Sequence, residues 1–119
     1  MLYTASNRSL ATVEYLVHLP MALMPIDIYI AELYIPDHIQ YEQVEIDKLP
    51  QDWAHYPAPF SLAKIGNDWI NRNESLLLKV PSCVVKGEYN FLINPKHIEF
   101  AKIRINNIQP YNFDDRLLK

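Results

Sequence analysis

Prolines end most of the apolar runs in this chain, while glycine is almost absent. The 119 residues contain nine prolines but only two glycines, Gly66 and Gly87. The apolar runs at residues 26–35, 75–80 and 90–94 are each followed at once by a proline. Because proline has no backbone N–H, it interrupts helices and the interior of sheets. The pattern predicts short secondary-structure elements joined by turns of Pro, Asn and Asp.

Six segments are predicted to be strands and two to be helices. The expected strands cover residues 2–4, 26–35, 41–46, 75–80, 90–94 and 102–108. The first helix should begin at Ser6 as its N-cap and end before Pro20, and the second should cover residues 61–73. In the second helix, Leu62, Ile65, Trp69 and Ile70 recur at helical spacing and should face inward. The elements do not alternate regularly as βαβ units, which favours an α+β fold with a mixed sheet.

The first helix carries a carboxylate beside its apolar side. At 100° per residue, Leu10, Val13 and Val17 lie on one face, with Glu14 next to them. An ionised group at an apolar interface is costly unless it is paired or hydrogen-bonded, so Glu14 either joins an ion pair or serves a chemical task. His18, one turn later, suggests a carboxylate–imidazole couple, but an ordinary pair of helical neighbours is the simpler interpretation.

Three further positions have both a functional and a structural interpretation. The free amides after Ser6, close to Tyr3, could receive a phosphate or belong to an ordinary capped helix. Ser82 follows a strand-ending proline, where an exposed hydroxyl could bond a ligand or close the turn. Cys83 has no base beside it in sequence, so we expect a small buried hydrophobic residue rather than a nucleophile.

Composition narrows the class of protein. A chain of 119 residues that is 50% hydrophobic fits one globular domain. The net charge of −3, with scattered lysines and arginines, disfavours direct nucleic-acid binding. One cysteine excludes an internal disulfide framework, four histidines without metal-ligand spacing argue against a metal site, and no apolar run is long enough to span a membrane. A protein of the cytoplasm is therefore expected.

Seven short segments follow one another in a specific order: residues 2–6, 9–14, 49–53, 66–69, 80–82, 90–97 and 113–117. In this order they resemble the RES-domain toxins of bacterial type II toxin–antitoxin modules. The resemblance runs along essentially the whole chain, and it implies a single RES domain over residues 1–119 with an ADP-ribosyltransferase-like fold.

The resemblance also implies an activity and its partners. The family consumes NAD as substrate, with no separate cofactor, by breaking the nicotinamide–ribose bond. This would make the protein an NAD glycohydrolase or an NAD phosphorylase, depending on whether water or phosphate is the acceptor. In that family a helix-turn-helix (Xre-type) antitoxin neutralises the toxin, and we expect either a homo-oligomer or a toxin–antitoxin hetero-oligomer.

The family's functional residues map onto this chain one by one. The glutamate maps to Glu14 and the serine to Ser82, and the resemblance implies that both are catalytic. The tyrosine maps to Tyr3, and we expect Tyr3 and Ser6 to bind NAD. A carboxylate such as Glu14 can stabilise the oxocarbenium-like state of glycosidic cleavage, and an aromatic ring offers stacking.

The family's arginine has no counterpart here. It belongs to a Gly-Arg-Trp-Asn-like segment before the tyrosine, so we expect that an N-terminal segment is missing through truncation or a misplaced start codon. The alternatives are an inactive remnant that only binds the antitoxin and a soluble α+β domain with a coincidental order of motifs.

Overall fold

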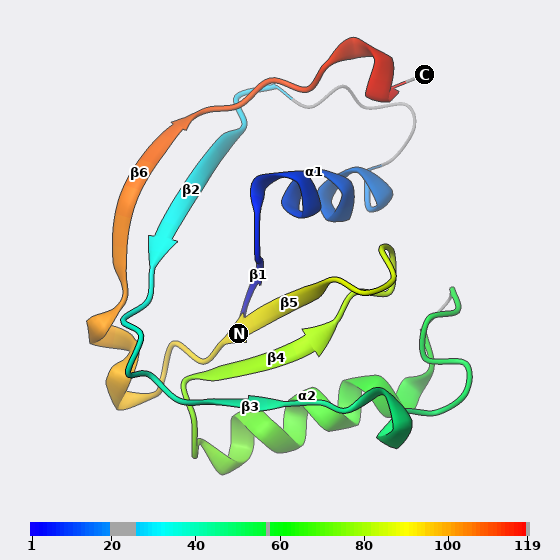
Figure 1. Cartoon of the computed structure of the whole chain (residues 1–119), viewed down its shortest axis with the longest axis vertical. Helices are drawn as coiled ribbons and strands as arrows, with labels where there is room; N and C mark the ends of the chain where they lie inside the picture. Colours follow the sequence, from blue (N-terminus) through cyan, green and yellow to red (C-terminus); the bar gives the residue numbers. More distant parts are fainter. Residues whose placement is uncertain (20–25, 57, 119) are drawn as a thin grey trace.

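Two sheets of different size organise the chain (Figure 1). The computed structural model describes residues 1–19, 26–56 and 58–118. Within them it contains six strands and two α-helices, which confirms the predicted α+β class. Three 3₁₀ helices complete the described elements: η1 (Ile46–Lys48), η2 (Ile98–Lys102) and η3 (Asp115–Leu118).

The larger sheet has four strands in the order β1-β5-β4-β3. Their bounds are β1 (Leu2–Ala5), β5 (Tyr89–Ile93), β4 (Leu77–Pro81) and β3 (Tyr41–Gln43). Strands β3 and β4 run parallel, whereas β1–β5 and β4–β5 are antiparallel, so the sheet is mixed as predicted. Strands β2 (Tyr29–Tyr34) and β6 (Arg104–Pro110) form a separate antiparallel ribbon beside this sheet (Figure 1).

The four-stranded sheet has a hydrophobic cluster on each face. Leu77 and Ile93 belong to one cluster, against which residues of the β2–β6 side pack. Leu78 and Leu92 belong to the other cluster, together with Trp69. Because neighbouring residues of a strand point to opposite faces, each of β4 and β5 contributes to both clusters. This alternation also determines which face each polar side chain of these strands occupies.

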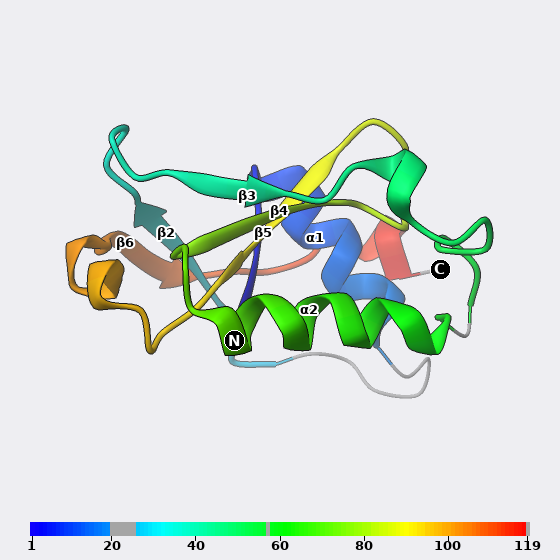
Figure 2. The same cartoon turned by 90° about the horizontal axis from the view of Figure 1, so that it is seen from below.

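Helix α2 (Phe60–Arg72) covers the face that carries Leu78 and Leu92 (Figure 2). Its inward face is the predicted one, since Trp69 is 1% exposed and Leu62, Ile65 and Ile70 are partly buried. The helix is capped at its C-terminal end by Asn73, whose φ of 52° lies in the left-handed region. Asparagine takes here the position that glycine commonly fills at a helix end.

Helix α1 (Arg8–Val17) differs from the prediction at both ends. Its N-cap is Asn7 rather than Ser6, because the Asn7 side chain accepts a hydrogen bond from the Leu10 N–H at 2.8 Å. The helix ends at Val17, and the predicted stop at Pro20 lies outside the described residues. Val17 is 53% exposed, contrary to its predicted inward position.

Contacts with the C-terminal residues help to determine which side of α1 is buried. Thr12 is buried on α1, and its hydroxyl shares a hydrogen bond with the hydroxyl of Tyr111. The ring of Phe113 stacks on Tyr15 with the ring centroids 5.7 Å apart. Helix α1 therefore packs against the C-terminal segment through Thr12 and Tyr15, which the apolar periodicity of the helix does not reveal.

Candidate active site

The carboxylate of Glu14 is the centre of a three-residue hydrogen-bonded cluster. Its Oε1 accepts one bond from Ser82 Oγ at 2.6 Å and another from Asn90 Nδ2 at 2.8 Å. The three residues come from α1, from the β4–β5 connection and from β5. His18 is exposed and caps the end of α1, and within the described residues it makes no hydrogen bond or ion pair with Glu14. Glu14 is thus held by neutral donors rather than by a cation.

Ser82 is buried, whereas the sequence suggested an exposed hydroxyl. The residue is only 2% exposed. The N–H groups of Val84 and Val85 donate to its Oγ at 3.1 and 3.0 Å, and its own N–H donates to the Glu88 carbonyl at 2.8 Å. The hydroxyl proton is therefore directed to Glu14 while the oxygen closes the turn.

The connection that carries Ser82 needs one unusual backbone conformation. Gly87 has a φ of 87°, a backbone angle that residues other than glycine rarely adopt. This turn brings Glu88 back to Ser82, so that β5 begins beside the end of β4. One of the two glycines of the chain is thus required to place the serine next to Glu14.

Asn90 is a site residue that our sequence analysis did not single out. It pairs with Val80 of β4 and with Ala5 of β1 in the sheet. It shares the face of Leu92, two residues along the same strand. A strand-interior asparagine next to apolar residues was the available signal, but only the register of β5 against its neighbours shows what it reaches.

Tyr3 and Ser6 lie in the segment that leads from β1 into α1. Tyr3 pairs with Leu92, so it lies on the same sheet face as Asn90, and it is 78% exposed. Ser6 is also exposed, and its hydroxyl does not cap the helix. No hydrogen bond of the described residues joins either side chain to Glu14 or Ser82. The structure brings Glu14 and Ser82 together and leaves Tyr3 and Ser6 facing solvent.

Cys83 is exposed, so the expectation of a small buried residue is wrong. Its thiol lies 3.6 Å from the Trp53 carbonyl oxygen. Partial burial raises the pKa of the Cys83 thiol, and the nearby negative charge of Glu14 raises it further. Because the thiolate is the reactive form, these effects make Cys83 a weak nucleophile.

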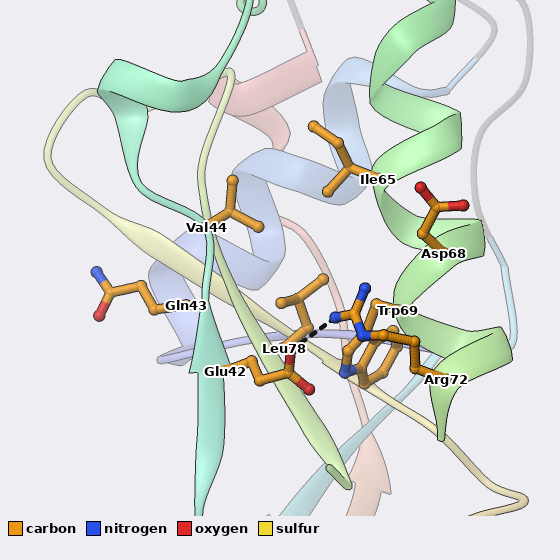
Figure 3. A pocket seen from close by; sticks show the side chains of 8 residues that line it. All are labelled: Glu42, Gln43, Val44, Ile65, Asp68, Trp69, Arg72 and Leu78. Carbon is orange, nitrogen blue, oxygen red and sulfur yellow. Dashed lines mark hydrogen bonds and ion pairs between the residues drawn. The ribbon is translucent and has the colours of Figure 1, made fainter. Parts of the chain in front are cut away.

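A cavity of about 230 Å³ lies elsewhere, between β3 and α2 (Figure 3). There Arg72 donates to Glu42 at 2.7 Å, and Ser75 Oγ donates to the same carboxylate at 2.6 Å. The Trp69 indole in turn donates to Ser75 Oγ at 3.0 Å. The Ser75 hydrogen bond, helped by Arg72, holds the pKa of Glu42 below its ordinary value. This network ties α2 to β3, and none of the predicted site residues lines the cavity.

The described part of the chain contains neither a membrane-spanning helix nor a cluster of metal-binding side chains. No helix there is long and apolar enough to cross a membrane. No group of three or more His, Cys, Asp and Glu side chains there could hold a metal ion. The described fold and site define a small α+β domain with one carboxylate held between a buried hydroxyl and an amide.

Comparison with known proteins gives this domain its family. Residues 1–114 match the family model of the RES domain, and the chain belongs to that family. It is 33% identical over 119 residues to the Prs ADP-ribosylating toxin of Sphingobium sp. (strain YBL2), covering 98% of this chain and 74% of the relative.

Other relatives carry the name Toxin Res, and two of them show the extent of the similarity. Toxin Res of Photorhabdus laumondii is 36% identical over 120 residues, covering 98% of this chain and 75% of the relative. Toxin Res of Yersinia enterocolitica is 34% identical over 118 residues, covering 98% and 76%. The family and these relatives support a toxin function.

Proposed function

We propose that this protein is an enzymatic toxin that depletes NAD by cleaving the bond between nicotinamide and ribose. The observation that carries the proposal is the Glu14 carboxylate, held through Oε1 by Ser82 and Asn90. A fixed carboxylate is the group that glycosidic cleavage requires, because positive charge develops on the ribose as the bond breaks. The family resemblance supplies NAD as the substrate.

Each residue of the site has a role in this reaction. The nicotinamide departs with the electron pair of the broken bond, and Glu14 stabilises the ribosyl cation that remains. The exposed ring of Tyr3, on the same sheet face as Asn90, offers a stacking surface for a flat ring of NAD. Ser6 offers an exposed hydroxyl that donates to the diphosphate. Ser82 acts through Glu14, because its proton is already donated there.

The acceptor of the ADP-ribosyl group has three candidates. Water would make the protein an NAD glycohydrolase, and phosphate would make it an NAD phosphorylase. The name of the Sphingobium relative favours a third acceptor, a side chain of a target protein. Incubation with NAD in phosphate buffer, in phosphate-free buffer and with cell lysate separates the three, because the products are ADP-ribose 1-phosphate, ADP-ribose and labelled protein respectively.

We further propose that a helix-turn-helix antitoxin neutralises the protein. We also propose that the toxin acts on the NAD pool of the cytoplasm. Both follow from the family resemblance. Co-expression with the product of the adjacent gene should give a complex that survives purification and has lost NAD turnover. A complex formed by a chain that never consumes NAD would instead favour a module that only binds its antitoxin.

The test is NAD loss by the purified protein. The wild type should consume NAD, whereas Glu14→Gln should lower the rate on the order of 100-fold or more, because the neutral amide cannot stabilise the cation. Glu45→Gln is the matched control, since Glu45 is exposed and lies outside the cluster. An intact, folded wild-type protein that leaves NAD unchanged contradicts the proposal.

A further inference from the structure

We propose that Asn90 is a positioning residue that fixes the Glu14 carboxylate for catalysis. The proposal rests on the function proposed above, in which Glu14 stabilises the ribosyl cation. Its basis is the 2.8 Å hydrogen bond from Asn90 Nδ2 to Glu14 Oε1 and the state of the other half of the amide.

The orientation of the amide follows from chemistry. An ionised carboxylate can only accept hydrogen bonds, so the side chain must turn its NH₂ group, and not its carbonyl oxygen, toward Glu14. The Asn90 Oδ1 atom is consequently directed away from the carboxylate. It is buried and has no hydrogen-bond partner among the described residues.

An unpaired buried carbonyl oxygen is unfavourable, and native proteins keep few of them. A leucine of similar shape at residue 90 would pack in the sheet without this cost. The asparagine is therefore explained by the one interaction that it does make. The donation to Glu14 offsets the unsatisfied oxygen, which identifies the carboxylate as the reason for the residue.

The geometry of the cluster shows what this donation achieves. Ser82 and Asn90 both donate to Oε1, and within the described residues no hydrogen bond or ion pair uses Oε2. Two donors from different elements hold Oε1 in place and leave Oε2 for the substrate. Asn90 lies on β5, an inner strand with a neighbour on each side, so the backbone that carries this donor is paired along both of its edges.

Kinetics of NAD turnover test the role. Asn90→Leu removes the donor and should lower kcat about 10- to 100-fold, with KM changed by less than about threefold, because Glu14 keeps only the Ser82 bond. Asn71→Asp is the control for a change at an exposed asparagine, and it should retain wild-type turnover. A kcat for Asn90→Leu within about twofold of wild type overturns the proposal while leaving the proposed function intact.

A pH profile adds a signature that a merely structural role would not produce. In Asn90→Asp the new carboxylate repels Glu14 at neutral pH, but a protonated aspartic acid donates to it. Turnover of Asn90→Asp, divided by that of Asn90→Leu at the same pH, should therefore be low at neutral pH and rise toward about pH 5. Among the described residues, the Cys83 thiol also lies close enough to sense the charge of Glu14, and its raised pKa keeps it protonated over this range. A profile parallel to that of Asn90→Leu contradicts the proposal.

Amide NMR tests the contact without any turnover. One side-chain amide proton of Asn90 should be shifted downfield and exchange slowly in the wild type, and it should lose both properties in Glu14→Ala, while the Asn71 amide stays unchanged. No change in the Asn90 amide overturns the proposal. If the wild type consumes no NAD, the proposed function fails and the catalytic role of Asn90 fails with it, whatever the amide signals show about the contact.

Discussion

Replacing Ser82 with alanine separates a serine that positions Glu14 from a serine that reacts. Ser82 Oγ makes three hydrogen bonds: it donates to Glu14 and accepts from the N–H groups of Val84 and Val85. A typical bond contributes about 0.5–1.5 kcal/mol. Val84 is exposed, so water can accept the hydrogen bond that its N–H group loses when Ser82 Oγ is removed. We expect the free energy of unfolding to fall by about 2 kcal/mol.

The same substitution should lower NAD turnover about 10- to 100-fold, because Glu14 retains the bond from Asn90. Loss of a nucleophile would instead cost a factor on the order of 10⁴ or more. Urea denaturation and NAD consumption measure the two effects, and Ser61→Ala, at an exposed serine of α2, is the matched control. Stability and turnover that both stay at wild-type values refute the bonding scheme. Complete loss of turnover in a folded variant refutes the positioning role.

Three further predictions concern the surroundings of the site. The Ser75 hydrogen bond lowers the pKa of Glu42 from an ordinary 4.5, so the ionised Glu42 carboxylate stabilises the fold above pH 4.5 and this stabilisation is lost as the pH falls below it. On acidification the urea midpoint should therefore fall less in Glu42→Gln than in wild type. An equal dependence of the two midpoints on pH would contradict this. Glu14→Gln should lower the raised pKa of Cys83, so iodoacetamide should alkylate the thiol faster at pH 7.5; an unchanged rate would place Glu14 too far away. Trp69→Phe removes the indole donor from a residue 1% exposed and should cost about 1–3 kcal/mol by urea denaturation, whereas no loss would disprove the role of that bond.

Local patterns predicted much of the fold because the forces behind them are local. The prolines after the apolar runs place the ends of several strands, and helical spacing identifies Trp69 as a core residue. Neighbouring alternatives were harder to rank: Asn7 caps α1 although Ser6, the residue before it, is also a good cap. Strand 26–35 begins only at Tyr29, after Asp27 adopts a φ of 56°.

The candidate site depends on contacts between residues that are far apart in sequence. Glu14 was identifiable as a carboxylate in an unusual place, but its partners lie 68 and 76 residues away. The position of Ser82 just after a strand predicted an exposed hydroxyl. That position does not reveal that α1, which is distant in sequence, brings Glu14 to it. Asn90 required the register of β5, which follows from how three strands pair and not from the composition of one.

We propose that Glu14 stabilises the ribosyl cation formed when the nicotinamide–ribose bond breaks, and proton NMR of NAD mixed with the purified protein follows that cleavage. Free nicotinamide should appear as NAD resonances decline in the wild type, and Glu14→Gln should release it on the order of 100-fold more slowly. A folded wild type that releases no nicotinamide, or a Glu14→Gln variant that releases it at the wild-type rate, contradicts this role of Glu14.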